Sequence, residues 1–213
     1  MIKEEEIAKD IYLKLAKKLS TVRDGAAQKL TQQVTVAMQT LAMEGGRFSV
    51  KQVPLEQGNV HGMEKIEFEV SPHQGMSLGP LAKIVSGGEL SRISLAIQVI
   101  TSEVSAVPTL IFDEVDAGIG GRVAEIVGGL LKKLGIERQV MCVTHLAQVA
   151  SAGNQQWQVA KFGDSDNGGN VLSHVTVLKD EERIEEIARM LGGVKITETT
   201  RKHAAEMLRE NKN

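Results

Sequence analysis

Apolar residues recur every three or four positions along the N-terminal part of the chain. This period is that of a long helix with one apolar stripe, free of proline and stopped by Gly45 and Gly46. The stripe consists of Ile11, Leu15, Leu19, Val22, Ala26, Leu30, Val34, Ala37 and Leu41. Its length favours a helical arm over residues 1–44 that pairs with another helix, although an ordinary helix packed along its own domain shows the same pattern.

After the glycine pair the pattern changes to alternation with period two, which is typical of β-strands. Residues 47–55 and 65–71 alternate apolar and polar side chains on either side of a turn-rich stretch. We expect these two segments to form antiparallel strands. The proline- and glycine-rich residues 72–83 are expected to be a loop that leads into the next helix.

Short apolar strands at 109–112 and 139–143 alternate with helical segments at about 88–105 and 120–134. This order is typical of an α/β fold with a parallel sheet flanked by helices, in which ligands gather at the carboxyl ends of the strands. A short helix after His145, a hairpin and two closing helices complete the expected lobe, which spans residues 45–213. The hairpin and closing helices are expected at 156–162, 171–178, 180–191 and 197–211.

The overall composition bounds the classes of function. The 213 residues carry a net charge of −2 and 3% of them are aromatic, which is unlike a chain that holds nucleic acid by itself. Lys195, Arg201, Lys202 and Arg209 are better interpreted as a solvated helix surface than as a basic patch, so no DNA contact is assigned. The sequence shows neither a membrane span nor a secretory signal, so the chain is expected to be cytoplasmic. Cys142 lies in an apolar run and is expected to be an inert buried thiol.

The stretch Ser86-Gly87-Gly88-Glu89 opens the first helix of the α/β region. One interpretation is a capping box, in which Ser86 and Glu89 satisfy each other's backbone amides. That reading explains the serine and the glutamate but not the two glycines, which weaken a helix and let another group approach its backbone closely. The alternative is therefore an anion site at the helix N-terminus, with phosphate as the expected anion.

Two adjacent carboxylates, Asp113 and Glu114, follow the apolar strand at 109–112. A carboxylate at this position suits magnesium, which takes oxygen ligands and water, and the second carboxylate can orient or deprotonate an attacking water. The alternative is a solvated acidic pair at a strand end. His145 follows the neighbouring strand and can contact a phosphate oxygen at the same sheet edge, or else serve as a structural hydrogen-bonding residue.

Together these stretches resemble the C-terminal half of an ABC-type ATPase head, a P-loop NTPase-like fold. Residues 85–92 resemble the signature motif, 109–114 the Walker B strand and 115–121 the D-loop. Transporter signatures usually carry Gln where this chain has Glu89, and the Glu form is similar to the chromosome-maintenance and repair branch. The longer stretches "PLAKIVSGGELSR", "FDEVDAGIGGRVAEIVG" and "RIEEIARMLGG" resemble the RecN family of bacterial double-strand-break repair ATPases.

The resemblance implies a role for each matching residue. Ser86, Gly87, Gly88 and Glu89 would meet ATP held on the opposite head, and Asp116 would act across the dimer interface. Asp113 would complete Mg²⁺ coordination, Glu114 would position the hydrolytic water, and His145, the switch histidine, would contact the γ-phosphate. The arm would be the returning helix of an antiparallel coiled coil.

The chain contains no Gly-x-x-x-x-Gly-Lys-Ser/Thr loop, so the Walker A cradle for phosphate is absent from it. In the family this cradle belongs to the N-terminal lobe, so we expect the chain to be part of a longer protein and inactive alone. Its expected partners are that lobe, a second head joined through ATP, and DNA in the complete protein. The alternative is a non-catalytic interaction module that scaffolds DNA or repair partners through the helical arm; a transporter ATPase subunit is disfavoured by Glu89 and the long arm.

Overall fold

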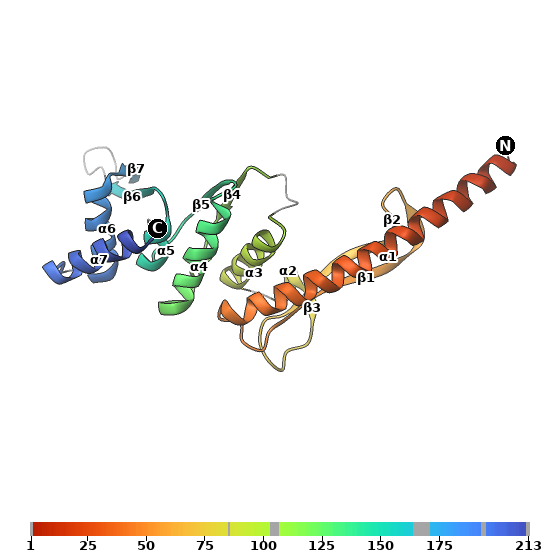
Figure 1. Cartoon of the computed structure of the whole chain (residues 1–213), viewed down its shortest axis with the longest axis horizontal. Helices are drawn as coiled ribbons and strands as arrows, with labels where there is room; N and C mark the ends of the chain where they lie inside the picture. Colours follow the sequence, from red (N-terminus) through yellow and green to blue (C-terminus); the bar gives the residue numbers. More distant parts are fainter. Residues whose placement is uncertain (1, 85, 103–106, 164–170, 193–194, 212–213) are drawn as a thin grey trace. The chain divides into compact units, whose positions relative to one another are not determined.

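The computed structural model describes residues 2–84, 86–102, 107–163, 171–192 and 195–211. The chain forms two compact units, residues 1–105 and 106–213, and each is described by itself (Figure 1). The expected boundary between residues 44 and 45 falls inside the first unit and stays a prediction. Among the helices of the described residues, none is long and apolar enough to cross a membrane.

The first unit combines one long helix with an antiparallel hairpin and two shorter helices. The hairpin pairs Arg47 with Ser71 at its open end and Asn59 with Gly62 at its turn, so both predicted strands are confirmed and extend further into the turn region than expected. Its elements are α1 (Ile2–Thr40), β1 (Arg47–Asn59), β2 (Gly62–Ser71), β3 (Gly79–Pro80), α2 (Leu81–Ile84) and α3 (Gly87–Ile100). The short β3 and α2 lie where a loop was expected.

Helix α1 packs along the β1–β2 hairpin (Figure 1). In its N-terminal part the least exposed positions, such as Tyr12, Ala16 and Ala27, are offset by one residue from the predicted stripe. The Tyr12 hydroxyl lies 3.1 Å from the carbonyl oxygens of both Asn59 and Gly62. Further along, the Phe48 amide donates to Thr35 Oγ1 over 3.0 Å. The predicted helix is confirmed, but it ends at Thr40 rather than at the glycine pair, because the chain turns through Ala42 at φ 59°.

The predicted apolar stripe divides into two parts. Val34 and Leu41 are fully buried in the first unit, whereas Ile11, Leu15 and Val22 are exposed, Leu15 to 63%. The C-terminal part of the stripe is packed as in an ordinary helix, and the N-terminal part presents apolar side chains that the described residues of the first unit leave exposed. Pairing of the exposed part with a second helix therefore stays a prediction.

The second unit begins with a parallel β-strand pair that confirms the expected α/β class. Strands β4 and β5 pair in register from Thr109 with Gln139 to Phe112 with Cys142, and α4 makes the crossover between them. A parallel pair needs such a crossover, and the buried face of α4 packs Val127 and Leu131 into the unit. These elements are β4 (Thr109–Phe112), α4 (Gly121–Leu134) and β5 (Gln139–Cys142).

The remaining elements follow the predicted order. They are α5 (Ala147–Ala152), β6 (Gln156–Gly163), β7 (Val171–Leu178), α6 (Asp180–Gly192) and α7 (Glu198–Glu210). Helices α5, α6 and α7 share an apolar core around Ile187 and Ala204, and the buried guanidinium of Arg183 donates to the carbonyl oxygens of Gly153 and Asn154. Most of the expected hairpin tip, residues 164–170, lies outside the described residues.

Candidate functional site

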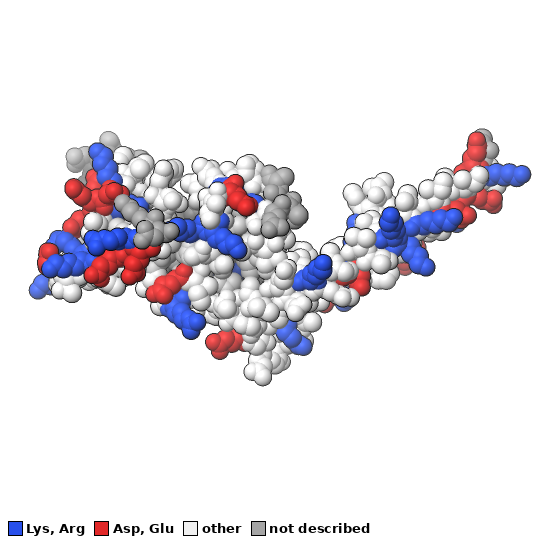
Figure 2. All heavy atoms as spheres, in the orientation of Figure 1, with Lys and Arg blue, Asp and Glu red and all other residues white. Residues whose placement is uncertain are grey.

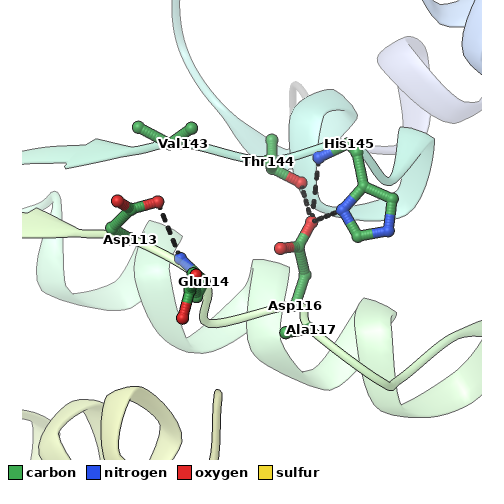
Figure 3. A pocket seen from close by; sticks show the side chains of 7 residues that line it. All are labelled: Asp113, Glu114, Asp116, Ala117, Val143, Thr144 and His145. Carbon is green, nitrogen blue, oxygen red and sulfur yellow. Dashed lines mark hydrogen bonds and ion pairs between the residues drawn. The ribbon is translucent and has the colours of Figure 1, made fainter. Parts of the chain in front are cut away.

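The two acidic residues and the histidine singled out from the sequence come together beside one pocket. Because β4 and β5 run parallel and in register, the residues that follow them emerge at the same sheet edge. The pocket there is an open hollow of about 220 Å³ (Figure 3). It is lined by Asp113, Glu114, Asp116, Ala117, Val143, Thr144 and His145.

Glu114 has an unusual backbone conformation. Its φ of 56° lies in the left-handed region, which costs a residue with a Cβ roughly 1–2 kcal/mol. The turn is held by two hydrogen bonds: the Glu114 amide donates to Asp113 Oδ1 over 2.9 Å, and its carbonyl accepts from the Ala117 amide over 3.1 Å. Successive side chains of a strand point to opposite faces, so this turn is what allows Asp113 and Glu114 to line the same pocket. Strain of this kind is often found at functional sites.

Asp116 is the most buried charged residue of the pocket, with 2% of its surface exposed. Its Oδ2 atom accepts from Thr144 Oγ1 at 2.5 Å and from the His145 amide at 3.0 Å, and it lies 3.2 Å from His145 Nδ1 (Figure 3). The carboxylate that the resemblance assigns to the dimer interface is thus engaged within its own chain. It ties the segment after β4 to the segment that follows β5.

The imidazole of His145 lies largely in solvent, with 70% of its side chain exposed. Its Nδ1 edge faces Asp116, and Nε2 points away from that carboxylate (Figure 3). A hydrogen bond at one ring nitrogen fixes the proton there and leaves the other for a ligand. The arrangement therefore presents Nε2 of a fixed imidazole beside two carboxylates.

The described residues contain no group of three or more His, Cys, Asp or Glu side chains arranged to hold a metal ion. Asp113 offers a carboxylate at the pocket wall, and Mg²⁺ is commonly bound by one or two carboxylates with the remaining positions filled by water and phosphate oxygens. The donor set therefore fits an ion that arrives with a nucleotide, and it does not fit a resident metal held by protein ligands alone.

Cys142 is the last residue of β5. Burial raises the pKa of its thiol to about 12, and the negative charges of Asp116 and Asp113 act in the same direction. A protonated thiol is a poor nucleophile and a poor metal ligand. The expectation of an inert residue agrees with this environment.

The predicted anion site lies in the other compact unit, at the N-terminus of α3. Ser86 caps the helix, with its Oγ accepting from the Glu89 amide over 3.4 Å while Glu89 Oε2 accepts from the Ser86 amide over 2.9 Å. The capping box is therefore present, and Gly87 and Gly88 form the first turn behind it. A capping box and a phosphate site are compatible, because the amides of this turn carry no side chains that would block a ligand.

Basic residues near the C-terminus do not form a uniform patch. Figure 2 shows acidic and basic side chains interleaved over α6 and α7. Arg201 Nε lies 2.6 Å from Glu185 Oε1, and this carboxylate raises the pKa of the guanidinium. The interpretation as a solvated helix surface agrees with this pairing.

Two residues of the candidate sites were not recognised as functional from the sequence. Thr144 directly precedes His145, and its hydroxyl is a donor to Asp116. His73, in the expected loop after β2, lies 2.9 Å from Glu89 Oε1. No local motif signals this pair, since the two residues are far apart in sequence.

Relatives of known function include the DNA repair protein RecN of Haemophilus influenzae, 46% identical over 98% of this chain and 37% of that protein. RecN of Vibrio cholerae is 43% identical over 96% of the chain and 37% of its own length. RecN of Bacillus subtilis is 34% identical over 97% of this chain and 38% of its own length. The chain therefore spans 37% of the length of the first two of these relatives. No protein-family model matches the chain.

Solved structures support the fold assignment. The Smc head domain with a coiled coil and joint from Pyrococcus yayanosii has a TM-score of 0.58 at 21% identity, over 87% of this chain and 33% of that one. The Smc head domain with an extended coiled coil from Pyrococcus furiosus, bound to the C-terminal domain of ScpA, has a TM-score of 0.54 at 20% identity, over 87% and 42%. At these identities the likeness concerns the fold, which is that of an SMC- or ABC-type ATPase head.

Proposed function

By sequence, this chain belongs to the RecN family of DNA repair proteins, and it spans 37% of the length of such a relative. From that premise we propose that the chain supplies one half of the nucleotide site of an ATPase head. The other half is a lobe with a Walker A loop, which the chain's own sequence does not contain. The proposed reaction is ATP hydrolysis coupled to the association of two heads in DNA double-strand-break repair.

The observation that carries this proposal is the convergence of Asp113, Glu114 and His145 on one pocket. The three residues come from two strand ends about thirty positions apart, and they line a hollow of about 220 Å³. A solvated acidic pair requires no histidine beside it and no strained backbone at Glu114. In a site for phosphoryl transfer, carboxylates can hold Mg²⁺ and orient the nucleophile, and a histidine beside them can contact the phosphate.

The two carboxylates have different tasks in this proposal. Asp113 supplies an oxygen ligand to Mg²⁺ that arrives with ATP, where the ion neutralises charge on the phosphates. Glu114 orients the attacking water and accepts its proton. Its left-handed backbone directs the side chain to the pocket.

His145 contacts the terminal phosphate through Nε2. Its Nδ1 lies 3.2 Å from Asp116 Oδ2, so the buried carboxylate holds the ring with Nε2 directed toward a ligand. Asp116 is then a positioning residue of its own head. The role across the dimer interface that the resemblance implies for Asp116 stays a prediction.

The N-terminus of α3 acts on a second nucleotide. Ser86, Gly87, Gly88 and Glu89 form a capped first turn whose bare amides suit a terminal phosphate held by the opposite head. In this arrangement a homodimer holds two nucleotides, each between one Walker A lobe and the signature turn of the partner. DNA binding belongs to the complete protein.

The test is to mix this chain with a Walker A lobe of a RecN relative and to measure ATP turnover and head association. The wild-type assembly should hydrolyse ATP, and Glu114→Gln should suppress turnover at least about 100-fold while retaining association held by nucleotide. Glu125→Gln, an exposed change on α4, is the matched control. Unchanged turnover in Glu114→Gln would remove Glu114 from its proposed role.

One observation favours a second candidate function, a non-catalytic interaction module. Ile11, Leu15 and Val22 expose apolar side chains on α1, and such a stripe suits a partner helix. If binding to the Walker A lobe survives deletion of residues 1–44 and is lost in Ser86→Arg, the head surface is responsible. The opposite result favours the arm.

A further inference from the structure

The short segment that carries His145 is held on both of its sides. On one side, Asp116 Oδ2 accepts from the His145 amide over 3.0 Å. On the other side, Leu146 is the N-cap of α5, and its amide donates to Thr144 Oγ1 over 3.1 Å. Only Leu146 separates His145 from the first residue of α5, so a shift of this helix is transmitted to the histidine.

Helix α5 is packed between α4 on one face and the pair α6 and α7 on another. Ala147 and Ala150 belong to the apolar core that α5 shares with α6 and α7. Asn211, at the end of α7, donates to Ser151 Oγ on α5 and accepts from Lys132 Nζ on α4. With α6 and α7 on one side, the contact with α4 determines where α5 can settle.

Gly128 lies within α4 at this contact. A Cβ atom at position 128 would lie 3.0 Å from Ala152 Cβ, 3.1 Å from the Gln148 carbonyl oxygen and 3.5 Å from Val149 Cα. Two of these distances are below the separation of about 3.5–4.0 Å at which non-bonded carbon atoms attract. None of the three atoms is the free end of a flexible side chain, so a backbone would have to move to admit a side chain here.

We infer that Gly128 is a positioning residue for His145: because it lacks a side chain, α5 lies close enough to α4 for the His145 amide and ring to reach Asp116. Glycine weakens a helix interior relative to alanine, and close approach of a second backbone is the use that offsets this cost. The inference rests on the proposed function, since the place of His145 matters to ATP hydrolysis only if its ring contacts the terminal phosphate.

Gly129 provides a matched control on the same helix. It is exposed, and among the described residues a Cβ atom at position 129 would meet no heavy atom of another element within 4 Å. Gly128→Ala and Gly129→Ala therefore bring the same gain in helix propensity, and they differ in whether the new methyl group presses on α5.

The test follows the His145 amide signal in two-dimensional NMR spectra of the full chain. Gly128→Ala should shift this signal in the same direction as Asp116→Asn, because both changes weaken the hydrogen bond to Asp116 Oδ2. Gly129→Ala should leave the signal in place. The double variant Gly128→Ala/Ala152→Gly removes the 3.0 Å contact and should return the signal part of the way.

A second readout is ATP turnover in the assembly with the Walker A lobe. A misplacement of about 1 Å can cost about 100-fold in rate, so the smaller shift expected in Gly128→Ala should lower turnover by roughly fivefold. Gly129→Ala should retain the turnover of the wild type.

An unmoved His145 signal in Gly128→Ala would overturn the inference, and so would an equal shift in Gly129→Ala or a double variant as displaced as Gly128→Ala. A Gly128→Ala variant that circular dichroism shows to be unfolded would also overturn it, because the glycine would then be required for the fold as a whole. The proposed function can fail separately: a wild-type assembly without turnover would contradict it, while the NMR comparison would still decide what places His145.

Discussion

Asp116 Oδ2 lies 3.2 Å from His145 Nδ1 and accepts the backbone amide of the same histidine over 3.0 Å. One buried carboxylate oxygen thus fixes both the main chain and the ring of His145. The bond at Nδ1 leaves Nε2 as the atom available to a ligand. The geometry of His145 therefore depends on a residue of the segment after β4 in the same chain.

Asp116→Asn should weaken the contacts with His145 while keeping a side chain of nearly the same size at position 116. An amide group accepts through one oxygen only and carries no charge, so we expect a loss of about 1–3 kcal/mol in the free energy of unfolding. In the assembly with the Walker A lobe, turnover should fall by about tenfold or more because the ring of His145 is held less firmly beside the pocket. Chemical denaturation and steady-state ATPase assays measure the two effects. Asp10→Asn, at an exposed position on α1, is the control, and equal turnover in both variants would contradict the positioning role of Asp116.

Glu114→Gly should make the chain more stable while abolishing its proposed catalytic role. Glycine adopts a φ of 56° without a steric penalty, so we expect a gain of about 1 kcal/mol in the free energy of unfolding. The same substitution at Glu125, an exposed position within α4, should instead destabilise by about 1 kcal/mol. Urea unfolding of the two variants measures whether the free energy of unfolding rises or falls in each. A destabilised Glu114→Gly variant would argue against backbone strain at this position.

Cys142 should react slowly with alkylating reagents in the folded chain. Its pKa is raised from an ordinary 9.0 to about 12, so at pH 8 the thiolate fraction and the rate should be about a thousandfold below those of an ordinary cysteine. The unfolded chain loses this proton at the lower pH, so the contribution of the thiol to stability is present below about pH 9 and is lost as pH rises toward 12. Iodoacetamide labelling with and without urea measures the difference. Equal rates in both conditions would contradict the buried environment of the thiol.

Local sequence patterns were sufficient to predict the elements that build the pocket. The apolar run at 109–112 and the carboxylates after it follow strand periodicity, and the second apolar run brings His145 to the same edge because the intervening helix makes the strands parallel. The left-handed backbone of Glu114 was not predictable, since nothing in its residue type favours that conformation. The packed face of α1 is displaced by one residue in its N-terminal part because tertiary contacts with the hairpin, such as that of Tyr12, outweigh the apolar period there.

Side-chain interactions between residues distant in sequence also could not be predicted from the pattern of apolar and polar positions. Asp116 was expected to work across a dimer interface, and only the folded chain reveals its bonds to Thr144 and His145. The pair of His73 and Glu89 likewise joins a turn after β2 to the start of α3. Periodicity reports which face of an element is apolar, and it carries no information on which polar side chains meet.

Whether this chain holds half of a nucleotide site is tested by ATP hydrolysis of the purified chain before and after addition of a Walker A lobe. We expect no turnover above background for the chain alone and sustained turnover in the mixture. Turnover by the chain alone at the rate of the mixture, or no turnover in a mixture whose two parts are shown to associate, would contradict it.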